Sequence, residues 1–209
     1  MEELIKKIEL LAETYSKNLK EKIEERKSEM ESDDTSHYLI YRVLGITDEE
    51  GKLIDSYQNT GRFLYKYAGS FLEEATILCF NFKYPEGEKT KIPNTEGEKP
   101  NTFEIDFLNK TDALEVKWRD ATTDGDHITK EHTRVKAIRN KGYKPIRVMF
   151  YYPQRDQAKR IQDTLKTLYA GVNGEYYADE EAWTFIKTYT GVDLKQILTD
   201  IADKKTKKQ

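Results

Sequence analysis

The sequence has very few of the residues that cross-link a chain or anchor it in a membrane. Among 209 residues there is one cysteine, Cys79, and there are five prolines. A single cysteine excludes an internal disulfide framework and a zinc site built from several thiolates. No run approaches the roughly 18 apolar residues of a membrane-spanning helix. The start, MEELIKKIELL, is too charged for a secretory signal, so we expect a cytoplasmic protein.

The sequence also has little net charge and few apolar residues. Lys and Arg number 35 against 38 Asp and Glu, which gives a net charge of -3, and apolar residues make up 37% of the chain. This balance argues against a protein that coats nucleic acid with a uniformly basic surface. The 14 Tyr, 8 Phe and 2 Trp exclude a largely disordered chain, because such chains are poor in aromatic residues. We expect a folded protein with charged segments around a modest core.

The chain length favours one domain over residues 1–209 rather than two small ones, and the order of hydrophobic patterns predicts an α/β fold. Apolar residues at three- and four-residue spacing predict a long N-terminal helix within residues 1–34, which either lies solvated along one side of the protein or pairs with a second copy. A central core is predicted over residues 60–152, followed by helices over 154–203. In detail, the pattern predicts a strand or short buried helix at 37–44, a turn-like stretch at 45–58, a helix at 60–74, a strand at 75–84, a loop at 85–100, strands at 103–108 and 113–118, a helix at 128–140, a strand at 144–152, helices at 154–170 and 179–203, and a turn at 171–174.

The most informative segment is the predicted hairpin FEIDFLNKTDALEVKW, residues 103–118. If residues 109–112 form its loop, Leu108 faces Ala113, and counting back along both strands places Asp106 opposite Glu115. Side chains directly opposite each other have Cβ atoms about 4.5–5.5 Å apart, so two bare carboxylates would repel. A divalent cation compensates such a pair, and Mg²⁺ prefers carboxylate and other oxygen ligands.

Lys117 follows Glu115 by two residues, so the alternation of a strand places both on one face. An amine next to a metal-bound water can orient that water, help to deprotonate it, or offset the charge of a phosphate. These are the groups that phosphodiester hydrolysis needs. The alternative is an ordinary Glu–Lys ladder on a solvated surface, which the spacing alone does not exclude.

Asp106 followed by Glu115-Val116-Lys117 on the next strand resembles the PD-(D/E)xK motif of restriction-endonuclease-like nucleases. Ile105 departs from the pattern, which usually has proline at that position. The resemblance implies a core of helix, three-stranded antiparallel β-meander, helix and strand, here with N- and C-terminal helical flanks. It also implies Mg²⁺ held by Asp106, Glu115 and the Val116 carbonyl, with Lys117 acting on water. The family often carries a further acidic residue on the preceding helix, for which Glu73 is our choice over Glu74.

Residues 113–153 are also similar, over their whole length, to the ApaLI-like type II restriction endonucleases. This resemblance implies a homodimer that requires Mg²⁺ and cuts double-stranded DNA at a short palindromic site. Two other functions stay open. One is a structure-specific or repair nuclease of the same superfamily, and the other is a DNA-binding protein without catalysis.

The local charge supports a polyanionic partner. Residues 127–160 hold ten Lys or Arg and two acidic residues, which makes the segment +8, so the rest of the chain carries -11 to reach the net charge of -3. Such asymmetry is typical of a protein with a local nucleic-acid surface. The alternative is a solvated, charged helix face.

Polar residues between and within these elements are candidates for contact with DNA. In the stretch after residue 118, Arg119 would pair with guanine, and Asp120 or Asp124 would accept a hydrogen bond from cytosine. A simple helix cap is the alternative for part of this stretch. The residues predicted to bind DNA are Arg119, Asp120, Thr122, Thr123, His127, Lys130 and Arg134, the last three through phosphates.

Overall fold

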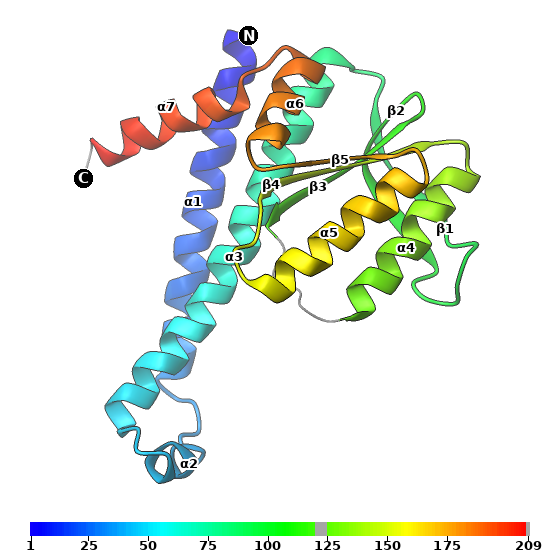
Figure 1. Cartoon of the computed structure of the whole chain (residues 1–209). Helices are drawn as coiled ribbons and strands as arrows, with labels where there is room; N and C mark the ends of the chain where they lie inside the picture. Colours follow the sequence, from blue (N-terminus) through cyan, green and yellow to red (C-terminus); the bar gives the residue numbers. More distant parts are fainter. Residues whose placement is uncertain (120–124, 208–209) are drawn as a thin grey trace. The chain divides into compact units, whose positions relative to one another are not determined.

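The computed structural model describes residues 1–119 and 125–207 and divides the chain into two compact units. The helical unit is Lys7–Phe71, and the sheet unit is Met1–Lys6 with Leu72–Gln209. Figure 1 shows the elements, which are α1 (Glu2–Met30), α2 (Tyr38–Val43), α3 (Asp48–Lys83), β1 (Glu88–Pro93), β2 (Thr102–Asn109), β3 (Asp112–Arg119), α4 (Gly125–Asn140), β4 (Lys144–Tyr151), α5 (Asp156–Gly171), β5 (Glu175–Ala178), α6 (Glu180–Thr190) and α7 (Leu194–Thr206).

Aromatic side chains join the two long helices of the helical unit. The ring of Tyr15 on α1 meets Tyr67 and Phe71 on α3 edge-on, with ring centroids 6.0 and 5.9 Å apart. Near the far end of this helix pair, Tyr38 of α2 is buried. The predicted N-terminal helix is confirmed as α1.

The sheet unit is built on five strands in the order β1-β2-β3-β4-β5. β1, β2 and β3 pair antiparallel, whereas β4 and β5 are parallel additions. In the β2–β3 hairpin, Leu108 pairs with Ala113 and Phe107 with Leu114, as predicted, but the ladder ends there and does not include the predicted pair of Asp106 and Glu115. The loop is two residues shorter than predicted, because Asn109 and Asp112 also pair.

The two faces of the sheet carry different helices. Met149 of β4 packs with Val135 of α4 and Leu165 of α5, and these two helices lie side by side across the sheet (Figure 1). The next residue, Phe150, contacts Trp183 of α6 on the other face, at a centroid distance of 4.3 Å. A strand covered on both faces is expected to be apolar throughout, as β4 largely is.

The segment 75–84 is helical, so its prediction as a strand was wrong. α3 continues through it to Lys83, and its buried residues are spaced three and four apart: Leu72, Ala75, Thr76, Cys79 and Phe80. This is the stripe of a helix packed on a sheet, and Phe80 stacks on Phe107 at 5.0 Å. Aromatic and β-branched composition favoured a strand, but the periodicity of burial decided otherwise.

Three further predictions need correction. The predicted loop 85–100 contains β1, whose alternate lysines make it a charged edge strand rather than a loop. The turn-like stretch 45–58 is mostly the start of α3, and segment 37–44 is a short helix with largely exposed side chains. Residues 175–178 form β5, which pairs with β4 and was not predicted.

The predicted fold class is confirmed. The chain is an α/β protein in which a helix, a three-stranded antiparallel meander, a helix and a strand follow one another, with helical flanks at both ends. The first strand of the meander is β1 rather than segment 75–84. Within the described residues, no helix is both long and apolar enough to cross a membrane.

Candidate functional site

The predicted acidic residue of β2 lies at an irregularity of the sheet. Glu88 and Thr90 of β1 pair with Leu108 and Ile105 of β2, so one residue on β1 faces the two residues Asp106 and Phe107 on β2. This is a β-bulge, a feature that redirects side chains and often occurs next to active sites. Ile105 and Asp106 are both buried despite being neighbours on the strand. The bulge therefore lets a carboxylate enter an otherwise apolar run.

Asp106 is held by the neighbouring strand and has a perturbed acidity. Its Oδ2 accepts a hydrogen bond of 2.8 Å from the backbone N–H of Val116 on β3. Burial raises the pKa of Asp106 to about 6, with further increases from the charges of Glu115 and Glu73; Lys117 acts in the opposite direction. A buried carboxylate next to two like charges would gain strongly from a cation.

Glu115 on β3 is surrounded by cationic groups. Its Oε1 contacts the amine of Lys117 at 2.9 Å and also contacts the guanidinium of Arg134 from α4. Its Oε2 accepts a hydrogen bond of 2.9 Å from Arg147 on β4. Burial opposes the charge of Glu115, but Arg134, Lys117 and Arg147 outweigh it and hold its pKa well below the ordinary value.

A second carboxylate extends this cluster into the core. Glu131 of α4 lies 3.2 Å from Arg147 and accepts a hydrogen bond of 2.5 Å from Tyr169 on α5. Burial and the charge of Glu115 raise the pKa of Glu131. The Nε–H of Arg147 is buried and has no acceptor among the described residues. Three cations thus surround two carboxylates, and Asp106, whose charge acts on Lys117, is a third carboxylate beside them.

Lys117 is the member of the cluster that reaches toward solvent. Its side chain is 37% exposed, against 7% for Glu115 and 1% for Arg147. The charge of Glu115, and next that of Asp106, raises the pKa of Lys117 although burial opposes this. The structure therefore brings Asp106, Glu115 and Lys117 together, as the hairpin pattern predicted.

Glu73 lies on α3 beside this group. Its carboxylate is 3.2 Å from the amine of Lys89 on β1, and its charge contributes to the raised pKa of Asp106. Lys89 also pairs with Glu104 at 2.8 Å. Glu74, by contrast, is exposed. Of the two acidic residues considered at this position, Glu73 is the one whose charge reaches Asp106.

The oxygen donors at this site suit Mg²⁺ in kind, but one of them is already occupied. Among the described residues, no three His, Cys, Asp or Glu side chains are arranged to hold a metal ion. Asp106 has the chemistry of a ligand, because a cation would offset both the cost of burying its negative charge and the repulsion from Glu73. Glu115 could join it only if the cations on its Oε1, Lys117 and Arg134, made room for the ion. The role of the Val116 carbonyl stays a prediction.

Four of the residues predicted to bind DNA lie in the described part of the chain. Arg119 ends β3 with an exposed side chain, 5.8 Å from the ring centroid of Trp118. Lys130 on the first turns of α4 is exposed and His127 is half-buried. Arg134, one turn after Lys130, turns inward to the buried carboxylates. The other three, Asp120, Thr122 and Thr123, lie outside the described residues.

Sequence reasoning missed the inner part of the cluster. Arg147 stands alone among apolar residues in KPIRVMFYY, and a charge in a buried strand is the signal that could have identified it. Glu131 is one of only two acidic residues in the basic segment 127–160, but nothing local showed that it faces Arg147 and Tyr169. These contacts join three separate elements, α4, β4 and α5, so they could not be predicted before the fold was known.

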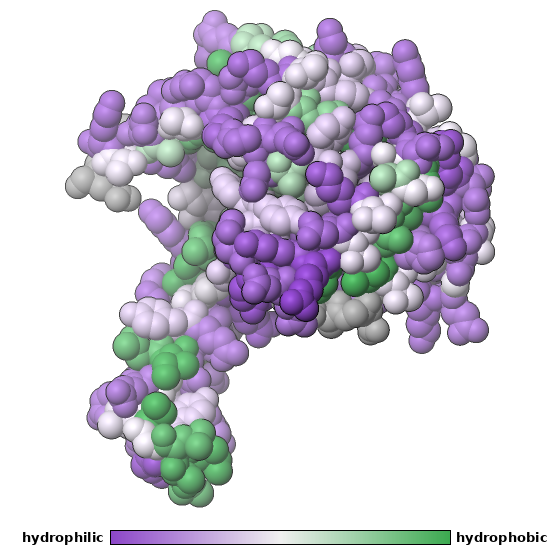
Figure 2. Space-filling model, in the orientation of Figure 1, coloured by the Kyte–Doolittle hydropathy of each residue, from purple (hydrophilic) through white to green (hydrophobic). Residues whose placement is uncertain are grey.

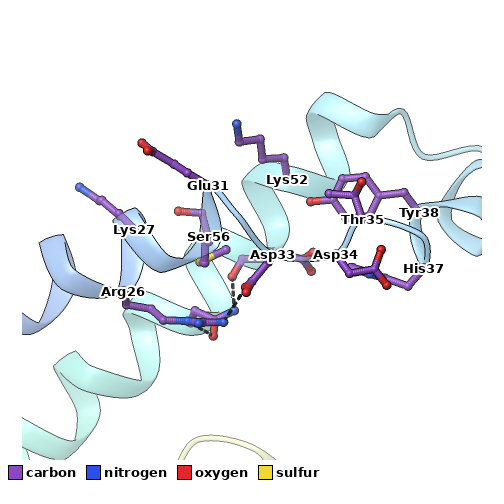
Figure 3. A pocket seen from close by; sticks show the side chains of 13 residues that line it. Arg26, Lys27, Glu31, Asp33, Asp34, Thr35, His37, Tyr38, Lys52 and Ser56 are labelled. Atoms are coloured by element: carbon purple, nitrogen blue, oxygen red, sulfur yellow. Dashed lines mark hydrogen bonds and ion pairs between the residues drawn. The ribbon is translucent and has the colours of Figure 1, made fainter.

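The helical unit contains a separate hollow where α1, α2 and α3 meet. Figure 3 shows side chains of both charge signs around it, with Arg26 turned toward Asp33. Arg26 pairs with Asp33 at 3.0 Å and with Asn59 at 3.2 Å, and His37 lies 3.2 Å from Asp55. These residues largely neutralise one another. We therefore place the candidate site in the sheet unit.

Comparison with known proteins gives one result that covers nearly the whole chain. A family model described as ApaLI-like restriction endonuclease matches residues 1–203 of 209. No curated protein and no solved structure matches the chain. The match includes both units and all the candidate residues named above.

Proposed function

Because the chain belongs to the ApaLI-like restriction endonuclease family, we propose that it is a type II enzyme, a homodimer that cuts double-stranded DNA at a short palindromic site with Mg²⁺ as cofactor. Restriction endonucleases hydrolyse phosphodiester bonds of DNA. The observation that supports catalysis here is the meeting of Asp106, Glu115 and Lys117 at the β2–β3 hairpin. A protein that only bound DNA would not need this set.

We assign the metal-binding role to Asp106, Glu115 and the carbonyl of Val116. Asp106 approaches from the bulge of β2, and its bond to the Val116 N–H fixes its orientation. Bound Mg²⁺ would polarise the phosphate and lower the pKa of an attacking water. Glu73 would act from α3, by holding a water molecule of the metal's hydration shell rather than the ion itself.

Lys117 has a role that follows from its electrostatic surroundings. The carboxylates beside it favour the protonated amine, so near neutral pH it donates hydrogen bonds and does not accept a proton. A protonated amine at the solvent-facing edge of the site can hold the attacking water in line or stabilise charge on the phosphate. We therefore infer a positioning and electrostatic role for Lys117 rather than that of a general base.

The exposed amine of Lys117 supports a phosphate as the partner of the site. Lys117 is the most exposed of the three cations that face Glu115 and Glu131. A DNA phosphate at this edge would accept a charge-assisted hydrogen bond from the amine of Lys117. We expect Arg119, Lys130 and the stretch 120–124 to contact the same DNA.

Cleavage of plasmid and phage DNA tests this function. Discrete fragments that form with Mg²⁺ and disappear with EDTA are expected, and Asp106→Asn should lower the cleavage rate by at least about 1,000-fold while DNA binding is retained. Cleavage restricted to branched DNA would favour a structure-specific nuclease. Binding without cleavage under every metal condition would show a non-catalytic DNA-binding protein.

A further inference from the structure

The end of the helical unit carries a large exposed apolar surface. Figure 2 shows apolar side chains gathered where α2 lies. Seven large side chains there are between 52% and 73% exposed. We call them the arm patch; they are Leu39, Ile40, Val43 and Leu44 from α2 and its C-cap, and Leu53, Ile54 and Tyr57 from the first turns of α3.

The spacing within the arm patch is that of a helix-packing face. On α3, Leu53 and Tyr57 are four residues apart, and Leu64, a further seven residues along, is also 52% exposed. Apolar residues at intervals of four and seven form the stripe with which one helix packs against another. Gly61 lies between them, and a Cβ atom added to it would meet nothing within 4 Å, so another helix could approach closely there.

The polar groups near the patch are already satisfied within the unit. Arg42 contacts both carboxylate oxygens of Asp48 at 2.9 Å, and Asp55 accepts hydrogen bonds from Tyr41 and pairs with His37. Burying the patch would therefore not strand these charges without partners. Asp48, Glu49 and Glu50 also begin α3 beside it, and this negative charge disfavours DNA as the occupant.

The size of the arm patch fits a protein partner. From their exposed fractions, the seven side chains present on the order of 800 Å², which is about one partner's share of a standard interface and more than the few hundred Å² usual for a monomer's apolar patch. We propose that the arm patch binds the arm patch of a second copy of this chain. A two-fold contact of this kind uses the same surface on both copies. This inference depends on the proposed restriction-endonuclease function only in that such an enzyme is expected to be a homodimer.

Sedimentation velocity over a concentration series tests the contact. The wild type is expected to be a dimer at micromolar concentration, and Val43→Glu with Ile54→Glu should weaken dimerisation by at least about 100-fold, because the paired charges would be buried. Leu10→Glu is the matched control, since Leu10 is 64% exposed on α1 outside the patch. A monomeric wild type, or a dimer unaffected by the double substitution, would overturn the proposal. Circular dichroism verifies that the variants remain folded.

Thiol labelling gives a second readout that does not depend on activity. Cys79 is fully buried, and burial raises its pKa to about 12, so an added cysteine is the reactive one. The maleimide labelling rate of Val43→Cys should fall as protein concentration rises, while that of Leu10→Cys should not. Equal rates for Val43→Cys at all concentrations would contradict the contact. If the wild type is monomeric and still cleaves DNA, the arm-patch contact is rejected and the nuclease function stands. If it forms a dimer through the arm patch but never cleaves DNA, the contact stands and the nuclease function is rejected.

Discussion

The carboxylate of Glu115 already has cationic partners, and a metal ion would have to displace at least one of them. Glu115 offers two oxygens, and Lys117, Arg134 and Arg147 already contact them. A buried ion pair of this kind is favourable only while all partners are present, and removing one leaves a charge without compensation. Arg134 and Lys117 both contact Oε1, the oxygen of Glu115 that a metal would need. Metal binding and the Arg134 contact are therefore expected to compete.

Substitution of Arg134 tests this competition. Arg134→Ala should raise the Mg²⁺ affinity of the DNA-free protein by roughly tenfold, since Oε1 of Glu115 then contacts one cation, Lys117, instead of two. Isothermal titration calorimetry, with thermal unfolding to verify folding, measures the effect. Lys130→Ala, one turn away and exposed, is the control and should leave the affinity unchanged. Unchanged or weaker Mg²⁺ binding by Arg134→Ala would show that Arg134 does not block the ligand.

The acidity of Asp106 gives a prediction for stability. Its pKa is about 6 in the folded protein, above the ordinary 3.8, so folding favours the protonated acid. Ionisation of Asp106 therefore lowers the free energy of unfolding progressively as pH rises from about 4 to about 6. Above pH 6 the loss levels off at no more than about 3 kcal/mol. Asp106→Asn keeps an acceptor for the Val116 N–H without the charge.

Metal-free Asp106→Asn should accordingly be more stable than the wild type at pH 8, and the difference should shrink toward pH 4. Urea unfolding at several pH values measures it. Asp203→Asn, at an exposed position of α7, is the control and should show no such trend. A destabilised Asp106→Asn at pH 8 would mean that the carboxylate is needed for folding. The wild type should also bind Mg²⁺ about tenfold more weakly for each pH unit below 6.

Among the elements, those set by local sequence were predictable. The β2–β3 hairpin has a short polar loop and matched apolar residues, so its register beside the loop followed from counting. Asp106, Glu115 and Lys117 were found together, although Asp106 and Glu115 do not pair across the strands. Segment 75–84 was not predictable from composition, because its helical state depends on packing of Cys79 and Phe80. The strand β1 was not predictable from its own residues either, because it forms by pairing with the edge of β2. The bulge at Asp106 and the partners of Arg147 likewise arise from tertiary contacts.

The junction between α5 and β5 is a position where one methyl group should matter. A Cβ at Gly174 would lie 2.6 Å from the backbone oxygen of Pro145 at the start of β4. Gly174→Ala should therefore cost about 1–3 kcal/mol of stability by pushing β5 away from β4. Gly171→Ala, three residues earlier at the end of α5, meets nothing within 4 Å and should be neutral or slightly stabilising. Equal urea midpoints for the two variants would contradict this account of the junction.

For the chain as a whole, the net charge of -3 hides a strong separation of sign. Residues 127–160 carry +8. Two of their ten basic residues, Arg134 and Arg147, balance buried carboxylates and are only 17% and 1% exposed. Exposed basic residues remain on α4 and after it, and these are Lys130, Lys136, Arg139, Lys141, Arg155 and Arg160. The surface available to DNA is therefore smaller than the segment's charge implies, but it adjoins the candidate site.

The salt dependence of DNA binding measures how many of these residues contact phosphates. Each contact adds about 0.9 to the slope of log K against log salt, because one counterion is released. Lys130→Ala should reduce the slope by about one and weaken binding to all sequences alike. Lys20→Ala, at an exposed position of α1, should leave the slope unchanged. If both variants shift the slope equally, the DNA surface is not centred on α4, and an unchanged slope for Lys130→Ala would remove Lys130 from the contact.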